Sequence, residues 1–292
     1  MLRDHIRQIT EDLIDELPAD GEFDVISRLA NPLPAIVTAE MLGVPTADHE
    51  LLKSWSQDFA EMLGNFQHNP GRAAKVIQSV ERMVAYFSAA VTAEATRPTE
   101  GLINALVTAE VDGDRLTEEE IVANVIVTMV GGQETTTNLI GNGLLTLLRQ
   151  PDELERLRSE PALMPTAVEE LLRYESPSQH TARLAPPGAV LGDAAIAEGD
   201  AVIAVMGAAN RDPERFPNPD RIDLARPDNR HVAFGWAGHF CFGAPLARIE
   251  GALAFETLLS RFDELALAPD EEIRWRPNLG LRGLTSLRVI AR

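Results

Sequence analysis

The sequence is short of cysteine, of basic charge and of long apolar runs, and each shortage excludes a class of protein. A single cysteine among 292 residues excludes an internal disulfide framework and favours a reducing compartment. Acidic side chains outnumber basic ones by 45 to 26, and the formal charge of -19 opposes non-specific binding to nucleic acid or to an anionic membrane. The most apolar run, Ile121 to Val130, is interrupted by Asn124 and is too short to span a bilayer. The first residues also lack the basic-then-apolar layout of a signal peptide, so we expect a cytoplasmic protein that binds neither nucleic acid nor membrane.

What is present is enough apolar material for a sizeable core, arranged mostly in helical periods. Apolar residues make up 45% of the chain, a share typical of globular proteins. Thr117, followed by three glutamates, begins a capping-box sequence that opens a helix of roughly 30 residues ending near Arg149. Further helices are expected over residues 2–16, 47–64, 72–95, 152–158, 163–174 and 244–262.

After Pro177 the pattern changes to short apolar pairs and triplets separated by glycines. It predicts strands at 190–191 and 201–205, an ordered loop over 210–233, and a small hairpin in the tail. We therefore predict a mainly α fold with a small β region (α+β), in a single domain over residues 1–292. The helical body is expected over about 1–176 and 244–262, and the β-rich and loop regions over about 178–243 and 265–292.

Cys241, the only thiol, lies in the segment FGWAGHFCFG (234–243), just before the last expected helix. The N-terminal amides of that helix would favour a thiolate, and the nearby glycines would let a large flat ligand approach the backbone. Three other interpretations stay open on this segment alone. The cysteine is buried and inert, or it is the nucleophile of a Cys-His pair, or it binds zinc together with His231 and His239.

Two further segments carry polar groups in unusual places. The long helix has GGQETTTN (131–138) at its middle, where glycines and threonines weaken a helix unless something compensates. There Glu134 and Thr135 pair an acid with an alcohol, which suits a proton relay through water, although on this segment alone a packing notch for a crossing helix is the preferred explanation. Glu170 and Arg173 stand at i and i+3 on one helical face, and such pairs are usually solvated.

Taken together, these segments resemble the cytochrome P450 family, in its soluble bacterial form. The segment 234–243 is similar to the haem-binding loop of the family, and the segment 131–136 to its oxygen-activation motif. Glu170 and Arg173 match the helical Glu-x-x-Arg pair, and Arg221 in FPNPDR stands where the third member of that ion network falls. ANRDP (209–213) is also typical of bacterial members. The resemblance runs over about the whole chain and implies the mainly helical fold of the family.

The resemblance implies a haem b cofactor with the Cys241 thiolate as axial ligand to iron, an arrangement that favours O–O cleavage. Glu134 and Thr135 would then deliver protons to bound dioxygen. The other haem-binding positions that it implies are Arg183, His231 and His239 at the propionates, with Phe234 and Gly243 near the cysteine. Substrate would be faced by residues 127–135, 178–185 and 279–283.

The activity implied is that of a haem-thiolate monooxygenase. It would insert one oxygen atom of dioxygen into a small apolar organic substrate, with electrons from a ferredoxin or a flavin reductase. Family members carry further residues before the helix that starts here, so the resemblance also implies an N-terminally truncated fold. The alternative is a truncated homologue with weak or no haem binding, inactive or serving as an interaction module. A cysteine hydrolase ranks last, because the sequence offers no oxyanion donors for it.

One departure from the family concerns the loop backbone. Ala237 stands where the family usually has glycine, and Gly238 follows it. If that position needs a positive φ, the alanine destabilises the loop.

Overall fold

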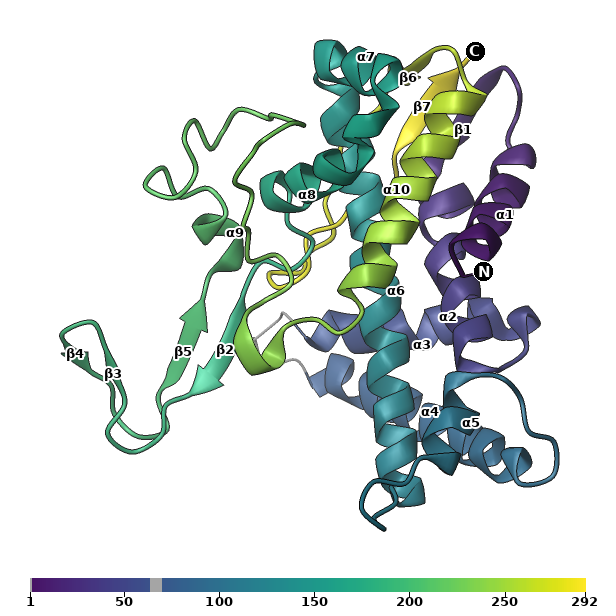
Figure 1. The fold of residues 1–292 in the computed structure, drawn as a ribbon, viewed down its shortest axis with the longest axis vertical. Coiled ribbons are helices and arrows are strands. Elements are labelled where there is room, and N and C mark those ends of the chain that lie inside the picture. The colour runs from purple at the N-terminus through teal and green to yellow at the C-terminus, as the bar shows by residue number, and fades with distance from the viewer. Residues whose placement is uncertain (1, 64–69) are drawn as a thin grey trace.

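The computed structural model describes residues 2–63 and 70–292, and its helices surround one long central helix, α6 (Glu118–Leu148). Figure 1 shows α6 running through the middle of the molecule with α10 (Ala244–Arg261) alongside it. Thr117 caps α6 by accepting a hydrogen bond from the amide of Glu120, while the carboxylate of Glu120 accepts one from the amide of Thr117. This reciprocal capping box satisfies two amides that have no partner within the helix, and it fixes where the helix begins.

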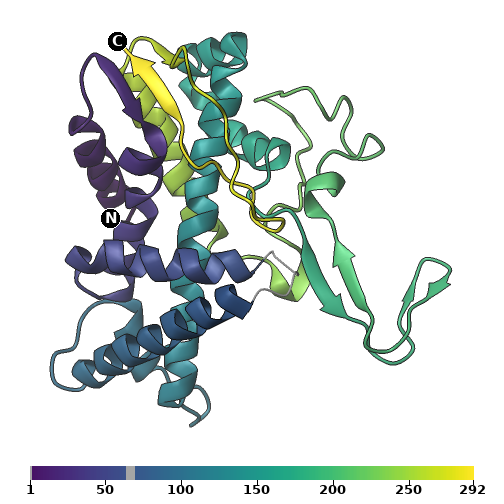
Figure 2. The same cartoon turned by 180° about the vertical axis from the view of Figure 1, so that it is seen from behind.

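The remaining helices pack on two sides of α6 and form two hydrophobic cores. One core contains buried residues of α1, α8 and α10, and the other contains those of α3, α4 and the first half of α6. Figure 2, the view from behind, shows α3 and α4 crossing in front of α6. The other α-helices are α1 (Leu2–Asp15), α2 (Pro32–Leu42), α3 (His49–Met62), α4 (Pro70–Glu94), α5 (Leu102–Thr108), α7 (Pro151–Ser159), α8 (Met164–Tyr174) and α9 (Met206–Ala209). A π-helix, η1 (Ile26–Ala30), and 3-10 turns, η2 (Thr46–Asp48), η3 (Pro161–Leu163) and η4 (Ala237–His239), connect them.

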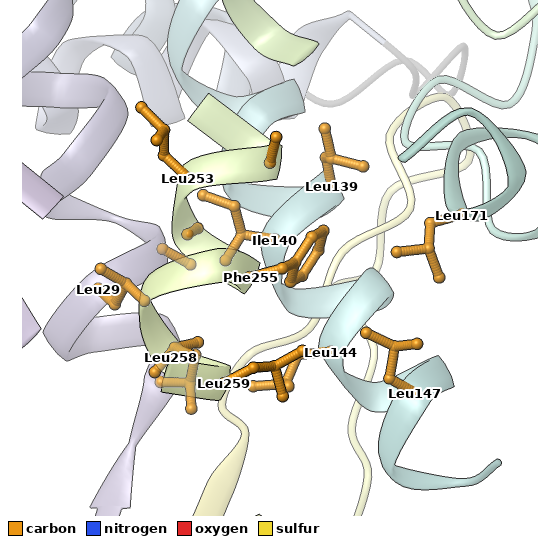
Figure 3. Packing of buried hydrophobic residues seen from close by; sticks show 14 of the residues in the cluster. Leu29, Leu139, Ile140, Leu144, Leu147, Leu171, Leu253, Phe255, Leu258 and Leu259 are labelled. Carbon is orange, nitrogen blue, oxygen red and sulfur yellow. The ribbon is translucent and has the colours of Figure 1, made fainter. Parts of the chain in front are cut away.

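Helices α6 and α10 run in the same direction and touch through glycines. A Cβ added at Gly143 would lie 2.5 Å from the ring of Phe255, and one added at Gly251 would lie 2.9 Å from Leu139. Figure 3 shows the leucines of α6 interleaved with Phe255 and the leucines of α10. A close approach of this kind leaves no room for larger side chains, and it fixes the relative height of the two helices.

The strands form three small antiparallel sheets. The first joins β1 (Gly21–Asp24), β7 (Arg288–Ala291) and β6 (Leu265–Leu267), in that order. The second pairs β2 (Thr181–Leu184) with β5 (Ala201–Ala204), with Thr181 opposite Ala204, and the third pairs β3 (Val190–Leu191) with β4 (Ala194–Ala195). The second and third sheets project away from the helical body (Figure 1).

The predicted fold class, mainly α with a small β region, is confirmed. The predicted helices are present with small shifts of their ends, and the predicted tail hairpin is β6 with β7. The end of the helix predicted over 47–64, and residue 1 of the predicted helical body, lie outside the described residues. Strands β1, β2 and β4 were not predicted. Within residues 2–63 and 70–292, every helix is too short or too polar to cross a membrane.

Candidate functional site

Cys241 lies in a tight loop between η4 and the start of α10, and its thiol is free and exposed. The loop is held by its own backbone. The amide of Cys241 donates to the carbonyl of Phe234 at 2.9 Å, and the amide of Ala244 donates to the carbonyl of Cys241 at 3.2 Å. Because α10 begins immediately after the loop and Gly243 gives it no side-chain cap, its free amides and dipole lie beside the cysteine. The predicted setting for a thiolate is therefore present.

The loop turns through two residues with positive φ. Gly235 has φ +74°, and Ala237, where the resemblance predicted a glycine, has φ +54°. The left-handed conformation is unfavourable for alanine by roughly 1–2 kcal/mol. The neighbouring Gly238 does not relieve this strain, because the positive φ stays at Ala237.

Aromatic side chains stand exposed around the cysteine. Trp236 and Phe242 are each 74% exposed, and Phe240 is 49% exposed. Phe234 lies beneath them, with its ring centroid 6.2 Å from that of Phe240 and the guanidinium of Arg248 4.6 Å above its face. Clustered large apolar side chains in water mark a surface that binds something apolar.

The start of α10 lies level with the glycines of α6. The contacts of Gly251 with Leu139 and of Gly143 with Phe255 set a common register. If the same register is counted about two helical turns towards the N-terminus of each helix, Gly131 of α6 corresponds to Gly243 at the start of α10. A Cβ at Gly131 would meet no atom within 4 Å, so this part of α6 borders open space rather than a crossing helix. The packing-notch interpretation is therefore wrong for Gly131, but it holds for Gly132, where an added Cβ would lie 3.3 Å from Oγ1 of Thr38 on α2.

Glu134 and Thr135 point to different partners. Oγ1 of Thr135 donates to the carbonyl of Gly131 at 2.8 Å, within the same helix. Glu134 is 3% exposed, and its carboxylate lies 2.5 Å from Nη1 of Arg276 and 3.5 Å from Nζ of Lys53. The predicted acid and alcohol are thus neighbours in sequence, but the acid is engaged by two cations and not by the alcohol.

Two of the predicted propionate-binding residues are free for such a role. Arg183, on β2, is exposed, and its guanidinium donates to Oγ1 of Thr181 and to the carbonyl of Ala182. His239, in η4, is exposed as well. Among the ion pairs of the described chain, neither side chain has a carboxylate partner, so both can receive one from a ligand.

His231 is placed differently from the prediction. Its side chain is buried, and its Nε2 lies 3.1 Å from Oε2 of Glu169 on α8. Burial opposes the ionisation of Glu169, but hydrogen bonds from Arg248 and His231 outweigh it and lower the pKa of this carboxyl to about 2. His231 therefore serves a structural ion cluster, and the zinc alternative fails too, because in the described part of the chain no three potential ligands converge.

Glu170 and Arg173 are fully buried, contrary to the expectation that such pairs are solvated. Both carboxylate oxygens of Glu170 accept hydrogen bonds from Arg173, each at 2.8 Å. The third cation is not Arg221, which is exposed and contributes only its carbonyl oxygen, but Arg226, whose Nε donates to Glu170 at 3.0 Å. The Arg221 prediction is wrong because Arg226, five residues further along the loop, reaches back to the same carboxylate.

Sequence reasoning also missed Lys53 and Arg276, the partners of Glu134. Their separation from Glu134 along the chain, 81 and 142 residues, hides them from any local pattern. One signal was available for Lys53: it is one of only two lysines in the sequence.

The arrangement fits a large flat cofactor of the haem type. An exposed thiol at a helix N-terminus offers a metal ligand, and the aromatic side chains around it offer an apolar surface against which the cofactor can pack. Arg183 and His239 offer cations for carboxylate substituents, and the bare backbone at Gly131 offers space on the opposite side.

Comparison with known proteins agrees with this geometry. The protein-family model described as Cytochrome P450 matches residues 40–282. Cytochrome P450 107B1 of Saccharopolyspora erythraea is 43% identical over 290 residues, which cover 99% of this chain and 70% of that protein. 6-Deoxyerythronolide B hydroxylase of the same organism is 37% identical over 290 residues, with the same coverage. The solved structure of P450BioI in complex with an acyl carrier protein ligated to hexadec-9Z-enoic acid has a TM-score of 0.93 and 38% identity, covering 99% of this chain and 74% of its own.

Proposed function

This chain belongs to the cytochrome P450 family of haem-thiolate monooxygenases, and we propose that Cys241 supplies the thiolate and α6 the proton donors. The observation that carries the proposal is the position of Cys241. The only thiol of the chain stands exposed at the N-terminus of α10, the helix that packs along α6. When bound, haem supplies the activation of dioxygen, while the protein orients the groups around it.

The chain's own residues then divide the remaining tasks. Phe234 and Gly243 form the protein surface beside the cysteine. Phe234 packs between Phe240 and Arg248, and Gly243 has no side chain to cover the thiol. Arg183 and His239 hold the carboxylates of the cofactor. Glu170, Arg173 and Arg226 form the buried ion network that fixes α8 against the loop before Cys241.

Protons reach the reacting oxygen through α6. The hydroxyl of Thr135 is only part-buried and is held by the carbonyl of Gly131, on the open side of the helix. We propose that it holds the last water or proton donor in place, while Glu134 supplies the proton from behind.

The substrate proposed is a small apolar organic molecule, and the electron donor a ferredoxin or a flavin reductase. Each segment expected to face substrate presents an exposed apolar side chain, namely Val127, Leu184 and Leu279, at 62%, 73% and 63% exposure. The P450BioI complex carries an acyl chain, and CYP109E1 is known in complex with testosterone, so structural neighbours bind apolar molecules. The single cysteine supports a cytoplasmic location.

The test is isotopic. Haem-loaded protein is supplied with a ferredoxin, a ferredoxin reductase and hexadec-9-enoic acid, testosterone or a macrolactone, under ¹⁸O-labelled dioxygen. The proposal predicts a hydroxylated product of at least one probe that carries one ¹⁸O atom, and its loss in Cys241→Ala. Product oxygen that comes from water, or no product from any probe, would overturn it.

A further inference from the structure

The cation beside Glu134 is unusual for this chain. The sequence has 26 basic side chains, and only two of them, Lys53 and Lys75, are lysines. Lys75 lies on α4 with its side chain 58% exposed, paired with Asp58. The side chain of Lys53, on α3, is 8% exposed. Arginine does not lose its proton in proteins, whereas a buried lysine can. The buried lysine of the described chain therefore stands next to the acid of the central helix.

Lys53 is held in a fixed geometry. Its Nζ donates to Oγ1 of Thr137 at 3.1 Å and lies 3.5 Å from Oε2 of Glu134. Thr137 donates its own proton to the carbonyl of Ala30 at 2.8 Å, so its oxygen is left free to accept from Lys53.

The charged groups that face Lys53 act in opposite directions. Burial is the largest influence and lowers the pKa of Lys53. Glu134 on α6 raises it, Arg276 in the segment before β7 lowers it, and Glu50 on α3 raises it. The net direction is downward, towards the range in which an amine exchanges its proton readily.

Lys53 also lines a cleft. A cleft of about 290 Å³ opens between η1, the start of α2, and α3, and Lys53 forms part of its wall. The polar side chains that line it with Lys53 are Ser27, Asn31, His49, Glu50, Ser54 and Gln57. The cleft is polar and has room for several waters. It shares no residue with the loop of Cys241, so it enters the protein from a separate surface.

We propose that Lys53 is a proton-relay residue, carrying protons from the water of this cleft to Glu134. An N–H bond of the ammonium breaks and an O–H bond forms on the Glu134 carboxylate, and the neutral amine then takes a proton from the water of the cleft. The net change is one proton moved inward from bulk water, with no electron transferred. The proposal rests on the proposed function only for the use to which that proton is put.

The first test needs no turnover. Protein labelled with ¹³C at the lysine ε-carbons gives two lysine signals, assigned with Lys53→Met and Lys75→Arg. Lys53 is expected to titrate at clearly lower pH than Lys75, the exposed control, and to shift further down in Glu134→Gln. If Lys53 titrates together with Lys75 or above it, the relay is refuted, whatever the enzyme does.

The second test uses haem-loaded protein and the fraction of electrons recovered in product. Lys53→Arg keeps the charge and the contact with Glu134 but cannot give up its proton. We expect it to lose coupling several-fold, as Lys53→Met does, with a changed solvent deuterium isotope effect. Filling the cleft with Ser54→Trp should lower coupling, whereas Gln78→Trp, on the exposed face of α4, should not. Full coupling in Lys53→Arg would mean that Lys53 only neutralises Glu134, and would overturn the relay.

Discussion

Replacing Arg226 by methionine should destabilise the protein, while the same change at Arg221 should not. Arg226 is 8% exposed and donates to three acceptors: the Glu170 carboxylate at 3.0 Å, the Pro217 carbonyl at 3.0 Å and the Arg221 carbonyl at 3.1 Å. The side chain of Arg221 is exposed and takes no part in the network. Methionine keeps most of the apolar stem of arginine, so the comparison isolates the guanidinium.

The expected loss of stability depends on the hydrogen bonds that Glu170 still accepts in the variant. A hydrogen bond to a charged group contributes about 1.5–3 kcal/mol, and a buried ion left with no partner costs about 3–5 kcal/mol. In Arg226→Met, Glu170 still accepts from Arg173, from Asn229 at 3.1 Å and from the amide of Asp223 at 2.9 Å. The free energy of unfolding should therefore fall by about 2 kcal/mol, as expected for a lost hydrogen bond to a charged group and not for an unpaired buried ion. Arg221→Met should change the free energy of unfolding by less than about 0.5 kcal/mol.

Urea unfolding followed by circular dichroism measures both variants against the wild type, with all three in the same haem state. Equal losses in the two variants, or a larger loss at Arg221, would refute the assignment of Arg226 as the third member of the network. Arg226→Lys adds a check, since lysine keeps the charge but cannot reach all three acceptors, and it should fall between the wild type and Arg226→Met.

Three further predictions concern the loop, the core and the central helix. Ala237→Gly removes the strain of a positive φ, roughly 1–2 kcal/mol, but the more flexible glycine lowers stability by about 0.4–1 kcal/mol through the unfolded state. Thermal melting should therefore show a net gain in stability below about 1.5 kcal/mol. Ala237→Val should lower the stability. Burial raises the pKa of Glu250 from 4.5 to about 8, so the folded state binds the extra proton and stability should fall as pH rises from about 4.5 to 8. Glu250→Gln should flatten that decline in urea titrations, and an unchanged slope would contradict the account. Thr135→Ala should lower the yield of product per electron, whereas Thr146→Ala, which loses the same kind of bond within α6, to the Asn142 carbonyl at 2.8 Å, should leave it unchanged.

The helices of this fold could be predicted because their causes are local. The capping box at Thr117 and the apolar period that follows specify α6 from a short window of sequence. Strand β1 could not be predicted in the same way, because four residues near the N-terminus are completed by β7, with Glu22 opposite Ile290. Pairing over such a distance depends on how the helices bring the two segments together, and no local pattern records it.

The site was predictable where one short segment carries it. The loop of Cys241 and the positive φ at Ala237 follow from the glycines and the alanine around them. The partners of Glu134 come from α3 and from the segment before β7, so only the folded chain shows that the acid is held by Lys53 and Arg276. Arg221 was predicted from its position in the family pattern, and only the folded loop shows that the side chain of Arg226 turns inward instead.

The central claim is that the Cys241 thiolate binds haem iron, and the ferrous–carbon monoxide spectrum tests it most directly. Purified protein reconstituted with haem should show a strongly red-shifted Soret band at a stoichiometry near one haem per chain, because a thiolate at the start of α10 ligates the iron. Cys241→Ala should lose the shift. A wild-type spectrum without the shift, or one that Cys241→Ala reproduces, would contradict the account.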